Sequence, residues 1–314
     1  MVEIAQQLKG RSLTAVRDWN PEEIRILLDL ADELKRAQKT GEEHRALPGR
    51  SLGMIFQKPS TRTRVSFEVG MAQLGGTALY LRADDLQLSR GETIRDTAMV
   101  LSRYVDAIAI RTFAHADVEE LARHATVPVI NALSDAAHPC EALADLMTIR
   151  EGLGRLSGVR LTYLGDGNNV CASLMVAAAK FGMAFVAATP AGYEPDAATV
   201  KLAMRVAVQS GGTVELVSDP REAARGSQVL YTDVWTSMGQ EAEREQRLAA
   251  LRGYGIDAET LALARDDAIV LHCLPAHYGE EITEEVAYGP QSAIWDQAEN
   301  RLHTQKALLA LVVR

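Results

Sequence analysis

Apolar residues follow two patterns along this chain. Short continuous apolar runs predict buried strands, and stretches in which apolar residues recur every three or four positions predict amphipathic helices. In the first half, strands are predicted at Ser51–Phe56, Ala78–Leu81, Ala107–Arg111 and Val127–Asn131. Helices are predicted at Pro21–Gln38, Thr63–Leu74, Ile94–Arg103 and Val118–His124. Strands that alternate with helices indicate an α/β unit with a mainly parallel sheet.

A second α/β series follows a long helix that is predicted to begin near Pro139 and to end at Gly152-Leu153-Gly154. Its strands are predicted at Arg160–Leu164, Ala184–Ala188, Val214–Val217, Val229–Asp233 and Ile269–Cys273. With 314 residues, the chain exceeds what one hydrophobic core usually serves, so two domains are expected. A last helix, Asn300–Val313, has an apolar face that could pack back onto either domain.

The segment Ser60-Thr61-Arg62-Thr63-Arg64 places two guanidinium groups where a helix is predicted to start. Helix N-termini expose N–H groups and carry a partial positive charge, so arginine there is unfavourable unless a ligand supplies negative charge. A strand, a turn and this helix start have the order of a phosphate-binding cradle. The alternative is that Ser60 is an ordinary N-cap and the arginines are solvated. We favour the cradle because Lys58, Arg62 and Arg64 carry more charge than a cap needs.

Composition and charge limit the partners. The formal net charge is -9, which argues against nucleic acid because phosphate backbones need a basic face. No run of 18 or more apolar residues is present, and Met1–Gln7 lacks the features of a signal peptide. We therefore expect a cytoplasmic protein that is not embedded in a membrane. The three cysteines, Cys140, Cys171 and Cys273, lack metal-type spacing, so neither a zinc site nor a disulfide framework is expected.

Polar clusters follow four of the predicted strands. These clusters are Arg111, Gly165–Asn169, Asp233–Gly239 and Cys273-Leu274-Pro275. Open α/β sheets bind ligands at the carboxyl ends of their strands. The sequence therefore predicts a ligand-binding cleft that these four clusters line.

Five motifs, in this order, resemble those of the ornithine carbamoyltransferases within the wider aspartate/ornithine carbamoyltransferase family. They are S-T-R-T-R from Ser60, H-P-C-E-A-L-A-D from His138, D-V-W-T-S-M-G from Asp233, H-C-L-P from His272 and E-N-R from Glu299. The resemblance spans nearly the whole chain. It implies a carbamoyl-phosphate domain (1–149), an ornithine domain (150–298) and a final helix (299–314) that returns to the first domain. It further implies a homotrimer, or a multiple of trimers, with active sites at subunit interfaces and neither metal nor cofactor.

The resemblance also implies which residues bind carbamoyl phosphate. They are Ser60, Thr61, Arg62, Thr63, Gln87, Arg111, His138, Glu141, Cys273, Leu274 and Arg301. Gln87 would come from a neighbouring subunit, although from the sequence alone its segment reads as an exposed loop. Arg111 and His138 would hydrogen-bond the carbonyl oxygen, where charge develops during the reaction. The alternative for His138 is a structural residue at a helix entry before Pro139.

Ornithine would be bound by Asn169, Asp233, Ser237 and Met238. A carboxylate such as Asp233 suits a substrate ammonium group that must be held without reacting. Cys273 would lie beside the attacking δ-amine, although a cysteine that ends a buried strand is more often a small apolar filler. By analogy, Glu280 could support Cys273 in a relay through His272 and Asp233. Glu141 is a departure, because the family pattern has Gln at this position.

The implied reaction is transfer of the carbamoyl group to the δ-amine of L-ornithine, giving L-citrulline and phosphate, with arginine biosynthesis as its expected role. The alternatives are carbamoyl transfer to another amine, a subunit that binds ligand without catalysis, and an NAD-dependent oxidoreductase. The last is suggested by Gly165-Asp166-Gly167 after a strand, but Val170 stands where a dinucleotide-binding turn needs a third glycine.

Overall fold

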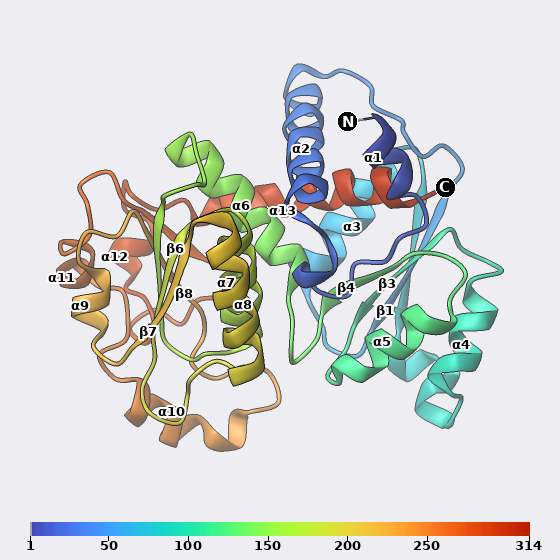
Figure 1. Cartoon of the computed structure of the whole chain (residues 1–314). Coiled ribbons are helices and arrows are strands. Elements are labelled where there is room, and N and C mark those ends of the chain that lie inside the picture. The colour runs from blue at the N-terminus through green and yellow to red at the C-terminus, as the bar shows by residue number, and fades with distance from the viewer. Residues whose placement is uncertain (1) are drawn as a thin grey trace. The chain divides into compact units, whose positions relative to one another are not determined.

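A computed structural model describes residues 2–314. The chain divides into two compact units, one formed by Met1–Ala144 with Glu299–Arg314 and the other by Asp145–Ala298. Each unit contains one parallel β-sheet flanked by helices (Figure 1), which confirms the predicted fold class. Two helices carry the chain from one unit to the other, α6 (Pro139–Leu153) and α13 (Ile294–Val312).

The first unit has a four-stranded sheet in the order β2-β1-β3-β4. Its strands are β1 (Ser51–Phe56), β2 (Thr77–Arg82), β3 (Ala107–Arg111) and β4 (Val129–Leu133). Its helices, apart from the parts of α6 and α13 that belong to it, are α1 (Val2–Gln7), α2 (Pro21–Thr40), α3 (Thr61–Gln73), α4 (Ile94–Leu101) and α5 (His115–His124), with 3-10 turns η1 (Val16–Asp18), η2 (Ala83–Asp85) and η3 (Gln87–Arg90). All five residues of β3 are buried, so this strand lies in the core of the unit.

The second unit has a five-stranded sheet in the order β7-β6-β5-β8-β9. Its strands are β5 (Arg160–Leu164), β6 (Ala184–Ala188), β7 (Thr213–Val217), β8 (Val229–Thr232) and β9 (Ile269–His272). The other elements are α7 (Asn169–Lys180), α8 (Ala197–Ser210), α9 (Pro220–Ala224), α10 (Arg244–Leu251), α11 (Ala258–Leu261), α12 (Glu284–Ala287) and η4 (Glu241–Glu243). Strands β5, β6 and β8 are almost fully buried, as expected for a parallel sheet covered on both faces.

Both sheets contain a point at which the order of strands reverses. In the first unit, β1 pairs with β2 on one side and with β3 on the other. In the second unit, β5 pairs with β6 on one side and with β8 on the other. The loops that leave two such strands diverge, and ligands of open α/β sheets bind between them. The fold therefore places one candidate site after β1 and β3, and another after β5 and β8.

The helix boundaries differ from the prediction in places. Helix α13 begins at Ile294, six residues before the predicted start at Asn300. The backbone of Ala293 already pairs with Val270, and a hydrogen bond from Gln297 N to Ala293 O (2.9 Å) closes the first helical turn. Among the described residues, no helix combines the length and apolar character that a membrane span requires.

Candidate active site

Helix α3 starts directly after β1, and Ser60 is its N-cap. The Ser60 side chain accepts a hydrogen bond from the backbone N–H of Thr63 (3.3 Å). Ser60 is therefore an N-cap, as the alternative interpretation held. This cap satisfies only one of the N–H groups that a helix start leaves open, so the others remain available to an anion.

Two of the three cations near this helix start are engaged by other groups. Lys58 Nζ lies 2.5 Å from the Asp135 carboxylate and 4.1 Å from the centre of the Phe113 ring. Arg64 donates to Glu68 at 2.9 Å and stacks on Tyr80. From the sequence, Lys58 and Arg64 are expected to contribute to an anion site; in the structure they form ion pairs instead.

Arg62 differs from its two neighbours. It lies in the first turn of α3 and is partly buried. Within residues 2–314, the structure records neither a hydrogen bond nor an ion pair from its guanidinium group. A cation at a helix N-terminus that lacks a carboxylate partner is the strongest sign of an anion-binding site in this unit.

Arg111 ends β3 on the other side of the same switch point. It pairs in register with Phe56 at the end of β1, and its carbonyl oxygen accepts a hydrogen bond from Gln57 N (2.8 Å). The side chain is buried. The two arginines, Arg62 and Arg111, thus lie beside the two loops between which a ligand is expected.

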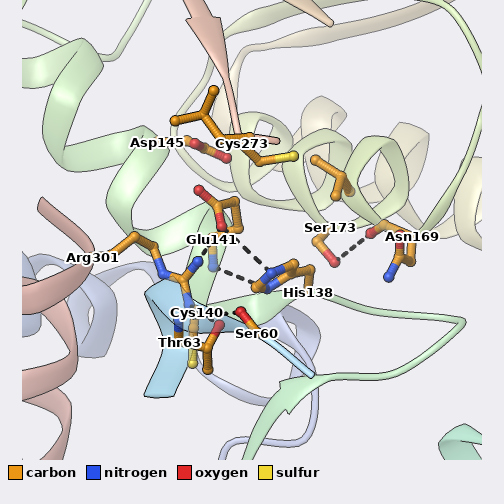
Figure 2. A network of polar contacts seen from close by, with 12 residues as sticks. Ser60, Thr63, His138, Cys140, Glu141, Asp145, Asn169, Ser173, Cys273 and Arg301 are labelled. Carbon is orange, nitrogen blue, oxygen red and sulfur yellow. Dashed lines mark hydrogen bonds and ion pairs between the residues drawn. The ribbon is translucent and has the colours of Figure 1, made fainter. Parts of the chain in front are cut away.

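Four buried residues form a polar cluster in the first unit (Figure 2). The Arg301 guanidinium on α13 is ion-paired with the Glu141 carboxylate on α6 and donates to Thr63 Oγ1 at 3.3 Å. His138 Nε2 lies 3.4 Å from the same Glu141 oxygen. The negative charge of Glu141 is therefore compensated by Arg301, a residue far away in the sequence.

The pKa of His138 is held well below its ordinary value, first by burial and then by the positive charges of Arg301, Arg111 and Arg62. The ring is neutral near pH 7. Because Nδ1 accepts from Glu141 N (3.4 Å), the single ring proton is assigned to Nε2. The unfolded chain binds more protons at this residue, so His138 lowers the free energy of unfolding as the pH falls below about 6.5.

The second unit brings together Asp233, Cys273 and Asn168. Asp233 is buried after β8; its carboxylate accepts hydrogen bonds from the Cys273 thiol (2.8 Å) and from Asn168 Nδ2 (2.7 Å). Asn168 Oδ1 caps α7 by accepting from Val170 N and Cys171 N. From the sequence, Asn168 is one member of the polar cluster Gly165–Asn169, and the signal for a specific role is its place as the N-cap before Asn169, the first residue of α7.

The relay suggested for Glu280 is wrong in its last member. The carboxylate that contacts His272 is Glu281, with 3.2 Å between His272 Nε2 and Glu281 Oε1. Glu280 instead forms an ion pair with Arg244. Glu281 is fully buried whereas Glu280 is partly exposed, and spacing alone could not distinguish the two neighbouring carboxylates.

The remaining predicted residues lie in loops and turns. Ser237 and Met238 belong to the turn after β8, where Ser237 N donates to Gln240 Oε1 (3.1 Å) and Met238 is exposed. Gln87 lies in η3 with an exposed side chain. Leu274 adopts a left-handed backbone (φ 56°), and its N–H donates to His272 Nδ1 at 2.8 Å. This conformation is costly for leucine and is typical of residues at functional sites.

Among the described residues, the side chains of Asp233, His272 and Cys273 approach one another closely enough to suggest a metal site, with ligand atoms within 4.8 Å. Both nitrogens of His272 are already engaged, Nδ1 by Leu274 N and Nε2 by Glu281. The Cys273 sulfur is hydrogen-bonded to Asp233. A metal would need a free imidazole nitrogen, and the cluster offers none in this arrangement.

The two glycines after β5 have structural roles. A Cβ atom on Gly167 would lie 2.3 Å from Pro195 N, and Gly165 has a φ of 130°. Only glycine fits both positions. These contacts explain the Gly165-Asp166-Gly167 pattern without a dinucleotide.

The fold and the two switch-point sites define a class of protein. This is an α/β protein with two parallel sheets, in which one unit presents a cationic helix start and the other a buried cluster of carboxylate, thiol and amide groups. The model of the "Aspartate/ornithine carbamoyltransferase, carbamoyl-P binding domain" matches residues 11–151, and that of the "Asp/Orn binding domain" of the same family matches residues 157–312. The chain belongs to the aspartate/ornithine carbamoyltransferase family.

Similarity to individual members covers almost the whole chain. An ornithine carbamoyltransferase of Pyrococcus horikoshii is 58% identical over 98% of this chain and 96% of its own length. One of Pyrococcus furiosus, named anabolic, is also 58% identical over 98% of this chain and 97% of its own length. A solved structure of an ornithine carbamoyltransferase from Pyrococcus furiosus has a TM-score of 0.95 and covers 98% of both chains. Membership of the family excludes the alternative of an NAD-dependent oxidoreductase.

Proposed function

We propose that this protein is an ornithine carbamoyltransferase. It transfers the carbamoyl group of carbamoyl phosphate to the δ-amine of L-ornithine, giving L-citrulline and phosphate. The observation that carries the proposal is Arg62, a cation without a carboxylate partner at the helix start of the unit that matches a carbamoyl-phosphate-binding domain. Relatives that are 58% identical and named ornithine carbamoyltransferase support the choice of amine.

Carbamoyl phosphate is proposed to bind in the first unit. Its phosphate group accepts hydrogen bonds from Arg62, from the N–H groups of Ser60 and Thr61, and from the hydroxyl groups of Ser60, Thr61 and Thr63 at the start of α3. Its carbonyl oxygen accepts from Arg111 and from the Nε2–H of neutral His138. These donors stabilise the charge that develops on that oxygen in the tetrahedral intermediate. The Glu141 carboxylate accepts from the carbamoyl –NH₂ group.

Ornithine is proposed to bind in the second unit. Its α-ammonium group donates to Asp233 and Ser237, and its α-carboxylate accepts from Asn169 and from the backbone N–H of Met238. The δ-nitrogen must lose a proton before its lone pair can attack the carbonyl carbon. Attack forms the C–N bond, and breaking of the C–O bond then releases phosphate, which takes up the proton that the attacking nitrogen loses. Catalysis rests on positioning and on fixed hydrogen-bond donors.

The direct test is an assay of purified protein with a panel of ornithine, putrescine, aspartate and N-acetylornithine, each with carbamoyl phosphate and without a nicotinamide. Citrulline and phosphate in equal amounts from ornithine are expected. Faster carbamoylation of another amine would replace ornithine as the substrate, and absence of carbamoylation with every amine would overturn the proposal.

We expect Cys273→Ala to lower turnover or to displace the pH profile of turnover. Activity of the unaltered enzyme should rise with pH as the δ-amine loses its proton, and Cys273 is proposed to lie beside that amine. The variant also removes the thiol that donates to Asp233. The measurement is kcat and kcat/KM for ornithine as functions of pH. Cys171→Ala, at a buried cysteine on α7, is the matched control. An unchanged profile would reduce Cys273 to a packing role.

We expect Glu141→Gln to keep turnover within about tenfold, or about 1.4 kcal/mol, and to lower the KM for carbamoyl phosphate. Gln retains an acceptor for the carbamoyl –NH₂ group, while its neutral side chain neither repels phosphate nor holds Arg301. The variant should melt at a lower temperature without ligand, because buried Arg301 loses its partner. Steady-state kinetics and thermal melts measure these effects, with exposed Glu43→Gln as control. A much larger loss of turnover would make Glu141 a required acid, base or ion-pair partner.

A homotrimer, or a multiple of trimers, and a role in arginine biosynthesis belong to the same proposal. Several large apolar side chains of the first unit are exposed, namely Val65 and Val69 on α3, Leu79 on the edge strand β2, and Met99 and Val100 on α4. Exposed apolar side chains of this kind suit contact with a second copy of the chain, whose Gln87 would reach the phosphate. The anabolic Pyrococcus furiosus relative supports the biosynthetic role. The three free cysteines suit a cytoplasmic location.

A further inference from the structure

The C-terminal helix α13 contacts the phosphate-binding helix α3 along one face. Residues Thr63, Ser66, Gly70 and Gln73 recur every three or four positions, so they share one side of α3. Three side chains of α13 reach this side. Arg301 Nη2 donates to Thr63 Oγ1 (3.3 Å), Gln305 Nε2 to Ser66 Oγ (2.9 Å) and Lys306 Nζ to Gln73 Oε1 (2.8 Å).

The packing between these polar contacts is close. A Cβ atom on Gly70 would lie 3.2 Å from Lys306 Cγ and 3.6 Å from Leu302 Cδ1. Glycine at this position therefore lets the aliphatic stem of Lys306 pass directly over the backbone of α3. The first, middle and last turns of α3 are each held by a different residue of α13.

Lys306 is unusual because its side chain is completely buried and its recorded partners are two glutamine amides and a histidine ring, with no carboxylate among them. Its Nζ donates to Gln38 Oε1 on α2 (2.9 Å), to Gln73 Oε1 on α3 (2.8 Å) and to His44 Nε2 (3.1 Å). An ammonium group has three N–H donors, which match these three acceptors one to one. A neutral amine would leave one acceptor without a donor. Burial lowers the pKa of Lys306 to about 8.

A buried cation without a carboxylate partner is costly, and groups of this kind concentrate at functional sites. Lys306 does not lie at the phosphate-binding end of α3. It contacts Gln73, in the last turn of the helix, where a cation also complements the helix dipole. Its connection to the proposed site therefore runs through α3 itself.

We propose that Lys306 and Gln305 are positioning residues for the carbamoyl-phosphate site, which set the placement of α3 and so of Arg62 and the N–H groups at its start. The proposal rests on the proposed function, because carbamoyl phosphate is the ligand whose binding it governs. It concerns affinity for that ligand rather than contact with the reacting atoms.

The test compares two glutamine neighbours of Lys306 that belong to different helices. Gln73→Ala removes the contact to α3, whereas Gln38→Ala removes the equivalent contact to α2. We expect Lys306→Met and Gln73→Ala to weaken binding of carbamoyl phosphate, measured by calorimetry without ornithine, by between about threefold and thirtyfold. Gln38→Ala should keep the affinity within about twofold, the scatter expected for a site that is not coupled.

The double variant Lys306→Met/Gln73→Ala separates positioning from general loss of stability. If Lys306 acts through Gln73, the double variant should bind no more weakly than Lys306→Met alone. Additive losses, or equal losses in Gln38→Ala and Gln73→Ala, would overturn the proposal. Gln305→Leu removes the contact to Ser66 and the hydrogen bond that Gln305 Oε1 accepts from Arg301 Nε (3.1 Å), while it retains bulk. It gives a second test in case Lys306→Met fails to fold. Unchanged affinity for carbamoyl phosphate in Gln305→Leu would show that Gln305 is not a positioning residue.

The affinity for carbamoyl phosphate as a function of pH gives a second readout, which a lysine with a purely structural role would not affect. Above about pH 8 Lys306 loses a proton, while carbamoyl phosphate stays a dianion well above the second phosphate pKa of about 6. Affinity of the unaltered protein should therefore fall above this pH, and Lys306→Met should lack the inflection. The titratable groups around Lys306 are His44, His303 and Glu299, with Lys35 and Lys39 on α2.

The same titration distinguishes failure of this inference from failure of the proposed function. If the unaltered protein does not bind carbamoyl phosphate, the proposed function is wrong and this inference falls with it. If it binds the ligand and all the α13 and α3 variants bind equally well, only the positioning role of Lys306 and Gln305 is wrong. The same conclusion follows if the unaltered protein shows no inflection in affinity with pH.

Discussion

Arg62→Ala is expected to abolish detectable turnover at ordinary concentrations of carbamoyl phosphate, a loss of about a thousandfold or more. A phosphate dianion that leaves water needs charge-assisted partners, and Arg62 is the cation at the start of α3 without a protein carboxylate. The primary defect should be in the binding of carbamoyl phosphate rather than in the chemical step. Calorimetric titration of carbamoyl phosphate into the variant measures this directly.

Arg64→Ala is the matched control, because it removes the same side chain two positions further along α3. Arg64 is held by Glu68 and by the Tyr80 ring, so its loss should leave carbamoyl-phosphate affinity within about tenfold. Phosphate or carbamoyl phosphate should also raise the melting temperature of the unaltered protein and of Arg64→Ala, but not of Arg62→Ala. Unchanged affinity in Arg62→Ala would show that the phosphate binds elsewhere.

The second large effect concerns the amine substrate. Ornithine should exceed putrescine in kcat/KM by about ten-thousandfold, because putrescine lacks the α-carboxylate and the α-ammonium group. Binding putrescine would leave the buried Asp233 carboxylate without its cationic partner, and an unpaired buried charge is costly. Steady-state kinetics with both amines at saturating carbamoyl phosphate measure the ratio.

Variants of Asp233 and of a distant aspartate test whether Asp233 is responsible for the preference for ornithine over putrescine. Asp233→Asn should lower kcat/KM for ornithine much more than for putrescine and so narrow the ratio. Asp267→Asn changes an exposed aspartate that pairs with Arg265 in the same unit and should leave the ratio unchanged. Similar constants for the two amines in the unaltered enzyme would mean that the segment from Asp233 to Met238 does not recognise the α-groups.

The strands were predictable because short apolar runs bounded by turn residues are a local signal. All nine strands lie within two residues of their predicted limits, including the hydrophobic β3 and β5. The polar clusters at the strand ends were predictable for the same reason, because a parallel α/β sheet brings its ligand-binding residues to one edge. The unusual cation Arg62 could be recognised from its position at a helix start.

The sequence alone determined the α/β fold class, the positions of the strands and the family motifs, since these depend on periodicity and on residues that are close in the chain. Only the tertiary structure decided which charges pair. Lys58 is balanced by Asp135, which is 77 positions away, and Arg301 pairs with Glu141, which is 160 positions away. Local patterns show which face of an element is polar. They do not show which distant polar group meets it, because that depends on the order of the strands and the packing of the helices.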